Sequence, residues 1–301
     1  MIDKVILAAK GFCMGAADVV PGVSGGTMAF ILGIYRQLID AIRSFDLVWL
    51  QHVIKFEIKP ALEKPHFAFI IPLVIGLFCA LLFFTRVIPL PVLLHTHPEP
   101  IYGLFFGLII GSIVTLSAEI EKFNFGAMFF ISIGAISGLF IVTLVPVTTP
   151  DTPLFIFLSG MIAITAMILP GISGSFILLV LHKYDTILNA IGHFNFMILV
   201  PFGFGVLAGL IVFSRFLGWL LQKYYAATLQ IIIGILIGSL WIIWPFQHRT
   251  YIEVHEKERL ISSTPYLPEM WNENVTYALL MMLFGFVVVF VMYLWGKKFR
   301  N

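Results

Sequence analysis

The chain alternates long apolar runs with short polar segments along nearly its whole length. A run of about 17 to 25 apolar residues can cross a hydrocarbon core roughly 30 Å thick. The sequence predicts six such transmembrane helices, at residues 67–84, 101–116, 125–145, 196–221, 229–244 and 275–295. We therefore expect an all-α polytopic membrane protein.

Two further apolar segments are each interrupted by a Pro-Gly-x-Ser-Gly motif. The arms on either side are residues 5–20 and 23–41 in one half, and 154–169 and 172–191 in the other. A single helix over both arms would be roughly 58 Å long at about 1.5 Å per residue, which exceeds the membrane thickness. The chain must turn back at each motif, so each half should contain a re-entrant or broken helical hairpin.

The two halves are sequence repeats. Residues 21–42 match residues 170–191 without a gap, with Tyr35 opposite Tyr184. Residues 71–86 and 107–112 match 200–215 and 234–239 in the same order. We expect one repeat at 1–150 and a second at 151–301, each a hairpin followed by three transmembrane helices, with residues 45–66 inserted in the first.

An odd number of crossings in each half would make the two repeats inverted relative to each other. Placing both termini in the cytoplasm leaves few basic residues outside, which the positive-inside rule favours. Those few are Arg86, Lys183, Arg249, Lys257 and Arg259. Inverted repeats with broken helices are typical of secondary transporters with a site near the midplane of the membrane. The alternative is a duplicated helical channel or scaffold.

Composition narrows the function classes. The chain is 60% hydrophobic and 11% charged, whereas soluble domains carry about 25% charged residues. Its formal net charge of +2, without a basic cluster, argues against nucleic acid as a partner. Cys13 and Cys79 lie inside apolar runs, where a disulfide is not expected. We predict no metal and no cofactor.

The motifs are candidate anion-binding elements. Pro21-Gly22 and Pro170-Gly171 would break the helices, and the amides that begin the next helices would then point at an anion. Hydroxyl groups add donors beside these amides. The predicted phosphate-binding residues of the motifs are Ser24, Gly25, Gly26, Thr27, Ser173, Gly174 and Ser175. The alternative is that these small residues serve only helix packing and capping.

Three charged positions inside apolar runs are further candidates. Arg86 and Arg215 match between the repeats, and a guanidinium suits a phosphate, although either could instead anchor a helix end at the interface. Asp18 precedes the first motif, and Met167 stands at the matching position. We interpret Asp18 as a candidate for proton coupling, or as a carboxylate bonded to the broken helix backbone. His182 and Lys183 are expected at a membrane interface.

At the segments Ala17 to Thr27 and Leu169 to Ser175, the chain resembles the bacterial membrane family long known as domain of unknown function 368, described as polyprenyl-phosphate transporters (PopT). The resemblance covers nearly the whole chain. It implies a flippase that returns undecaprenyl phosphate from the outer to the inner leaflet of the cytoplasmic membrane during cell-envelope synthesis. The second motif has Ser175 and Phe176 where the first has Gly26 and Thr27, so we expect the two half-sites to contribute unequally and take the residues of the first as the stronger candidates.

Two other functions remain as alternatives. A channel or exchanger for small inorganic anions would use the same broken helices. An intramembrane serine hydrolase would use Ser24 as its nucleophile, but no histidine lies within 20 residues of Ser24, so we expect no enzyme. As partners we expect polyprenyl phosphate, membrane lipids and protons as the coupling ion, with a homodimer left open. Alternating access should come from rocking one repeat against the other.

Overall fold

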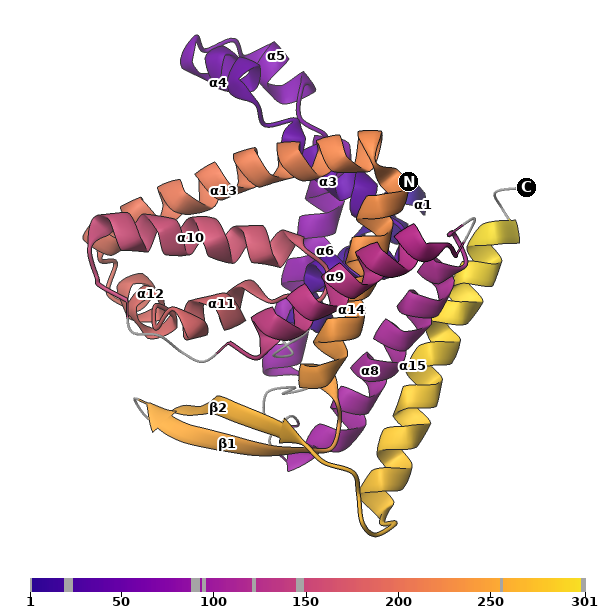
Figure 1. The fold of residues 1–301 in the computed structure, drawn as a ribbon. Coiled ribbons are helices and arrows are strands. Elements are labelled where there is room, and N and C mark those ends of the chain that lie inside the picture. Colours follow the sequence, from indigo (N-terminus) through magenta and orange to yellow (C-terminus); the bar gives the residue numbers. More distant parts are fainter. Residues whose placement is uncertain are drawn as a thin grey trace.

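A computed structural model describes residues 2–18, 24–87, 93, 96–120, 123–144, 149–254 and 257–298 (Figure 1). The first half contains α1 (Ile2–Asp18), α2 (Gly25–Ile31), α3 (Tyr35–Arg43), α4 (Leu47–Ile54), α5 (Ile58–Glu63), α6 (Phe67–Arg86), α8 (Pro98–Ser117) and α9 (Phe125–Val142). The second half contains α10 (Pro153–Ile168), α11 (Gly174–Val180), α12 (Tyr184–Gly192), α13 (Phe196–Lys223), α14 (Tyr225–Ile243), β1 (Gln247–Val254), β2 (Lys257–Pro265) and α15 (Glu273–Lys298).

The six predicted transmembrane helices are confirmed within the described ranges. The helices α6, α8, α9, α13, α14 and α15 are long and apolar enough to cross a membrane. The helices that precede the motifs are shorter, with 17 residues in α1 and 16 in α10. The architecture is therefore that of an all-α polytopic membrane protein, with a strand pair added outside the helical part. Both cysteines are free.

The arms that follow the motifs are not continuous helices, and the sequence analysis did not predict where they divide. Each divides into two short helices, α2 and α3 in the first half and α11 and α12 in the second. Gly33 has φ +67° and His182 has φ +52°, so each break contains a residue in the left-handed region at the same register of the repeat. Glycine permits this conformation readily, but His182 gave no such signal in the sequence.

The described elements repeat in the same order. The helices α2 and α11 each have 7 residues, and α3 and α12 each have 9. The helix α1 packs on α6 as α10 packs on α13. Both crossings are close, since a Cβ on Gly76 would collide with the Ala8 carbonyl, and one on Gly205 with the Phe157 carbonyl. The inverted orientation of the repeats in the membrane stays a prediction.

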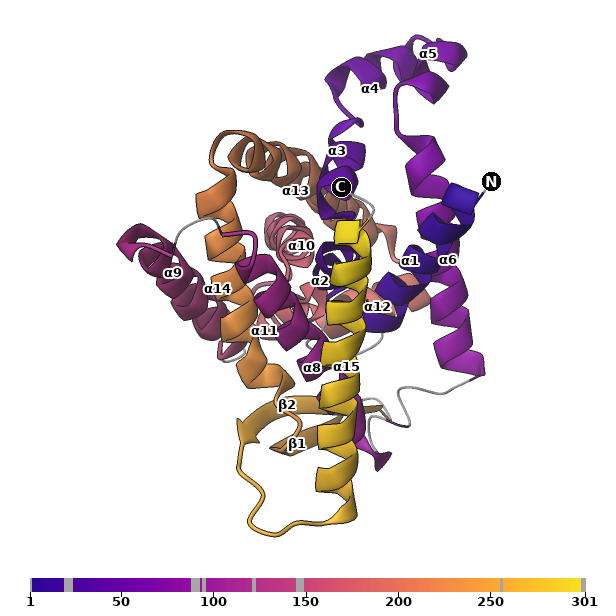
Figure 2. The same ribbon diagram turned by 90° about the vertical axis from the view of Figure 1, so that its right-hand side faces the viewer.

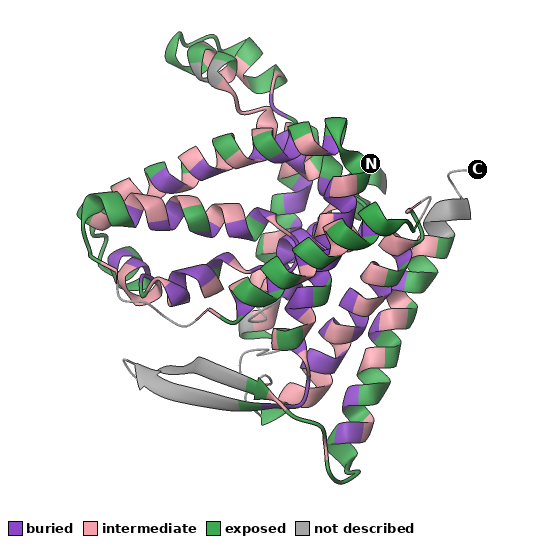
Figure 3. Ribbon diagram, in the orientation of Figure 1, coloured by how far each residue is buried: buried purple, intermediate pink, exposed green. Residues whose placement is uncertain are grey.

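The last two helices of each half pack against helices of the other half. The helix α8 lies along α15, and α9 lies along α14, as Figures 1 and 2 show. Glycines again permit close contact, because a Cβ on Gly107 would collide with Met282 and one on Gly234 with Ile131. Most of α14 is buried at the centre of the molecule (Figure 3). The two halves are therefore interleaved.

Two polar segments extend from the helical body. The inserted residues form the helical pair α4 and α5, which projects beyond α3 and α6 (Figure 2). Asp46 caps α4 through the Trp49 amide and forms a 2.6 Å ion pair with Lys64, whose hydrogen bond lowers the pKa of Asp46. On the opposite side of the molecule, β1 and β2 form an antiparallel hairpin. The sequence analysis did not predict these strands.

Candidate functional site

The first motif caps the short helix α2 from within its own repeat. We call Asp18 together with Ser24 to Thr27 the first tip. The Ser24 hydroxyl accepts a 3.1 Å hydrogen bond from the Gly26 amide, and the Asp18 carboxylate accepts a 2.7 Å bond from the Gly25 amide. Two of the predicted anion donors are therefore already occupied by side chains of the protein. Pro21 and Gly22, the predicted helix break, lie outside the described residues.

The second motif, Leu169 to Ser175, forms the second tip. Pro170 and Gly171 stand in the turn between α10 and α11, and Gly171 has φ +88°, a conformation that favours glycine. The hydroxyls of Ser173 and Ser175 lie 2.7 Å apart on the accessible side of the tip. Ser173 does not cap α11 with its side chain. Gly174 is buried against Ala163 and Met167.

The two tips are in direct contact. The Gly171 amide donates a 2.8 Å hydrogen bond to the Thr27 hydroxyl, and the Ser24 hydroxyl donates a 3.4 Å bond to the Met167 carbonyl. Ser24 and Thr27 are each only 1% exposed. These two hydroxyls therefore join the repeats, whereas the hydroxyls of the second tip remain accessible.

Two residues that the sequence analysis did not assign complete the contact. The Tyr35 hydroxyl donates a 2.9 Å bond to the Ile168 carbonyl at the end of α10. In the sequence, only the match of Tyr35 with Tyr184 between the repeats pointed to this residue, and that match did not indicate its hydrogen-bond partner. Ser239 on α14 lies behind the second tip, where its hydroxyl would be 3.1 Å from a Cβ on Gly171. It belongs to the matched segment 234–239.

The two matched arginines are not joined to the tips by any recorded contact of the described residues. Arg86 is the last residue of α6 and is exposed, and Arg215 is partly buried within α13. An exposed guanidinium at a helix end has the position of an interfacial anchor. Both remain candidates for attracting an anion toward the tips.

Lys183 is buried. Its side chain is 2% exposed and forms a 2.7 Å ion pair with Asp151 and a 2.6 Å hydrogen bond to the Thr149 carbonyl. Lys183 is therefore buried whereas His182 is exposed, and the position of both residues at a membrane interface stays a prediction. The bonds of Lys183 to Thr149 and Asp151 hold the turn after α11 against the segment before α10.

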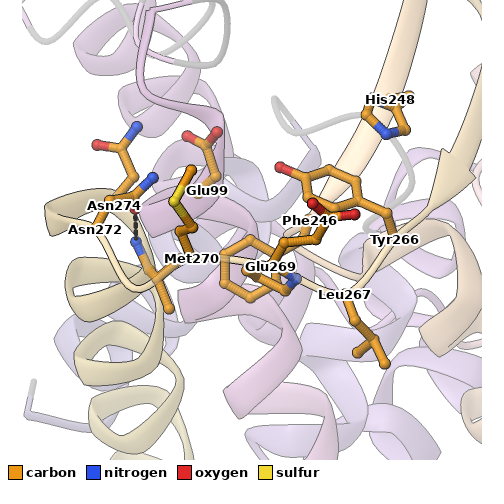
Figure 4. Close-up of a pocket in the computed structure, with 11 residues that line it drawn as sticks. Glu99, Phe246, His248, Tyr266, Leu267, Glu269, Met270, Asn272 and Asn274 are labelled. Atoms are coloured by element: carbon orange, nitrogen blue, oxygen red, sulfur yellow. Dashed lines mark hydrogen bonds between the residues drawn. The ribbon is translucent and has the colours of Figure 1, made fainter.

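A cavity of about 450 Å³ lies at the foot of the strand hairpin (Figure 4). Its walls include Glu99 of α8, Glu269, and the His248 and Tyr266 rings, whose centres are 4.3 Å apart. Two carboxylates disfavour an anionic ligand. None of the motif residues lines this cavity, so it is separate from the tips.

Comparison with known proteins identifies the family of this chain. The family described as undecaprenyl phosphate translocase-like (VCA0040-like) matches residues 14–261. A polyprenyl-phosphate transporter of Vibrio cholerae is 41% identical over 238 residues, covering 79% of this chain and 77% of the relative. A polyprenyl-phosphate transporter of Staphylococcus aureus is 37% identical over 262 residues, covering 80% of this chain and 87% of the relative. No solved structure matches significantly. The chain belongs to the undecaprenyl phosphate translocase-like family.

Proposed function

We propose that this protein moves a polyprenyl phosphate, most simply undecaprenyl phosphate, from the outer to the inner leaflet of a bacterial cytoplasmic membrane. Both relatives are named polyprenyl-phosphate transporters, which supports this substrate class. The observation that carries the proposal is the contact between the tips, where hydrogen-bond donors of both repeats gather inside an apolar protein. A phosphate group needs such donors, while an isoprenoid tail can stay in lipid.

In this proposal the phosphate first meets the second tip. Ser173 and Ser175 present accessible hydroxyls, while Ser24 and Thr27 are engaged between the repeats. The amides of Gly25 and Gly26 are bonded to Asp18 and Ser24 of their own tip, so the phosphate reaches these amides only by displacing those side chains, and the Gly174 amide adds a donor in the second tip. Arg86 and Arg215 would supply positive charge on the path of the phosphate. This order of engagement gives the two tips unequal parts in binding.

The packing of α8 on α15 and of α9 on α14 restricts how the site could open. Rocking one whole repeat against the other would separate α8 from α15 and α9 from α14, which are packed at glycine crossings. Movement of the hairpins against this frame keeps those pairs intact. We therefore propose that the hairpins, and not whole repeats, move during alternating access. The two repeats remain residues 1–150 and 151–301, and we place both termini in the cytoplasm.

Asp18 is the proposed coupling residue. Its carboxylate already accepts the hydrogen bond of the Gly25 amide, so an incoming phosphate would compete with this carboxylate for the same donor. Release of the carboxylate on protonation would free the amide and link substrate movement to the proton gradient. Substrate flux that is independent of a pH gradient in proteoliposomes would refute this coupling.

Hydrolysis is the weaker alternative. A serine nucleophile requires a base within hydrogen-bond reach. The recorded partners of the Ser24 hydroxyl are the Gly26 amide and the Met167 carbonyl, neither of which can accept its proton as a base. This geometry supports transport over catalysis.

Native mass spectrometry of the purified protein tests the proposal, with undecaprenyl phosphate, undecaprenol and inorganic phosphate as separate probes. We expect binding of undecaprenyl phosphate in preference to undecaprenol. That binding should weaken in Ser24→Ala with Ser173→Ala, and in Arg86→Ala with Arg215→Ala. Equal binding of the alcohol would refute a phosphate site. Binding of inorganic phosphate alone would favour the inorganic-anion channel or exchanger.

A further inference from the structure

The helix α1 contacts both ends of α2 with charged groups. At the start of α2, the Asp18 carboxylate accepts the 2.7 Å bond from the Gly25 amide. At its end, the Lys10 ammonium donates a 2.9 Å bond to the Leu32 carbonyl. A helix carries partial positive charge at its amino end and partial negative charge at its carboxyl end. The two side chains therefore complement both ends of α2.

The second repeat lacks both charges. Ser159 stands at the position that matches Lys10, and Met167 stands at the position that matches Asp18. The Ser159 hydroxyl bonds to the Phe155 carbonyl of its own helix, so it does not reach α11. The repeats thus share a backbone plan but differ in how the short helix is held.

In the second repeat, α11 is held at its carboxyl end. The Thr149 hydroxyl donates a 2.7 Å bond to the Leu181 carbonyl, and buried Lys183 bonds to Thr149 and Asp151. At the amino end, the Ser173 hydroxyl pairs with Ser175 and provides no cap. The helix α11 therefore has an anchor at one end, whereas α2 has one at each end.

We propose that Lys10 and ionised Asp18 act together as positioning residues that fix α2 in the substrate-free protein, so that the first tip is the stationary half of the site when the tips part and α11 is the half that moves. This inference rests on the proposed function for its role in transport. The fixed first tip would keep Thr27 and Ser24 in place, and α11 would pivot about the Lys183 anchor to break and remake the contact between tips. Lys10 does not contact the tips and acts through α2.

Amide hydrogen exchange of the full chain in nanodiscs, measured without substrate, tests the inference. In the wild type, we expect the first-turn amides of α11 to exchange about tenfold faster than those of α2. Lys10→Met and Asp18→Asn should each accelerate exchange in Gly25–Ile31 and leave Gly174–Val180 unchanged. The matched controls Ser159→Ala and Met167→Leu should leave α2 exchange at the wild-type level.

Two further variants guard against a general loss of folding. Lys10→Arg keeps the charge and should retain wild-type exchange in α2. Met167→Asp places a carboxylate at the start of α11 and should slow exchange there. Equal exchange of α2 and α11 in the wild type, or no effect of Lys10→Met and Asp18→Asn on α2, would overturn the inference. Because no substrate is present, this result is independent of whether the protein transports polyprenyl phosphate.

Discussion

The Thr27 hydroxyl accepts a 2.8 Å hydrogen bond from the Gly171 amide, which lies 144 residues further along the chain. Both groups are buried, and the bond joins the two motifs. A side chain of the first tip thus provides the acceptor for a backbone amide at the break in the second tip. It also gives a local probe of whether the tips are together.

Replacing Thr27 with valine should destabilise the protein. Valine has a similar shape but leaves the buried Gly171 amide without its acceptor, which costs about 1 to 3 kcal/mol. Thermal unfolding in detergent would measure the loss. Thr143→Val is the control, because Thr143 is exposed and bonds only within α9 and its end. A similar melting temperature for wild type and Thr27→Val would contradict the importance of this bond.

The double variant Ser173→Ala with Ser175→Ala should weaken binding of undecaprenyl phosphate about tenfold and leave stability nearly unchanged. Two accessible hydroxyls are lost, and each hydrogen bond to a charged group is worth about 1.5 to 3 kcal/mol, part of which water can replace. Titration in nanodiscs would give the affinities. Ser132→Ala with Ser137→Ala, two exposed serines of α9, is the matched control and should bind like wild type. Unaltered binding in the first variant would remove these serines from the site.

Gly171→Ala should be more harmful than Gly33→Ala. Both glycines have positive φ, so each alanine costs roughly 1 to 2 kcal/mol in backbone strain. At Gly33 a Cβ meets open space, whereas at Gly171 it would approach the Ser239 hydroxyl at 3.1 Å. Gly171→Ala adds this crowding to the strain. Denaturation of both variants separates the two effects, and equal losses would show that the tip tolerates a Cβ.

The pair α4 and α5 should lose order in acid. The Lys64 hydrogen bond lowers the pKa of Asp46, so the ionised form is favoured in the folded state. This contribution is complete above the unfolded pKa, about 3.9, and disappears as pH falls through the lower folded value. Trp49 fluorescence, taken as the difference between wild type and Trp49→Phe, would follow the transition. Asp46→Asn should abolish this pH dependence, and an unchanged transition would exclude Asp46 as its cause.

The sequence was informative wherever a local pattern determines the structure. Hydrophobic length predicted the six long helices, and the repeated motif predicted the turn at Pro170. The breaks at Gly33 and His182 were not predicted, because the apolar pattern continues across them. We interpreted Asp18 either as a proton-coupling residue or as a carboxylate bonded to the backbone of the broken helix, and its bond with the Gly25 amide agrees with the second interpretation. The contacts of Thr27 with Gly171 and of Tyr35 with Ile168 depend on how distant segments pack, which no local pattern specifies.

The interleaving of the halves has a consequence for biosynthesis. The helices α8 and α9 are made early, but their packing partners α15 and α14 begin 175 and 100 residues later in the chain, respectively. The glycine surfaces of α8 and α9 must therefore stay in lipid, or beside an insertion factor, until translation is nearly complete. Release of the chain before α15 would leave α8 without its partner, so a truncated product should be recognised by membrane quality control.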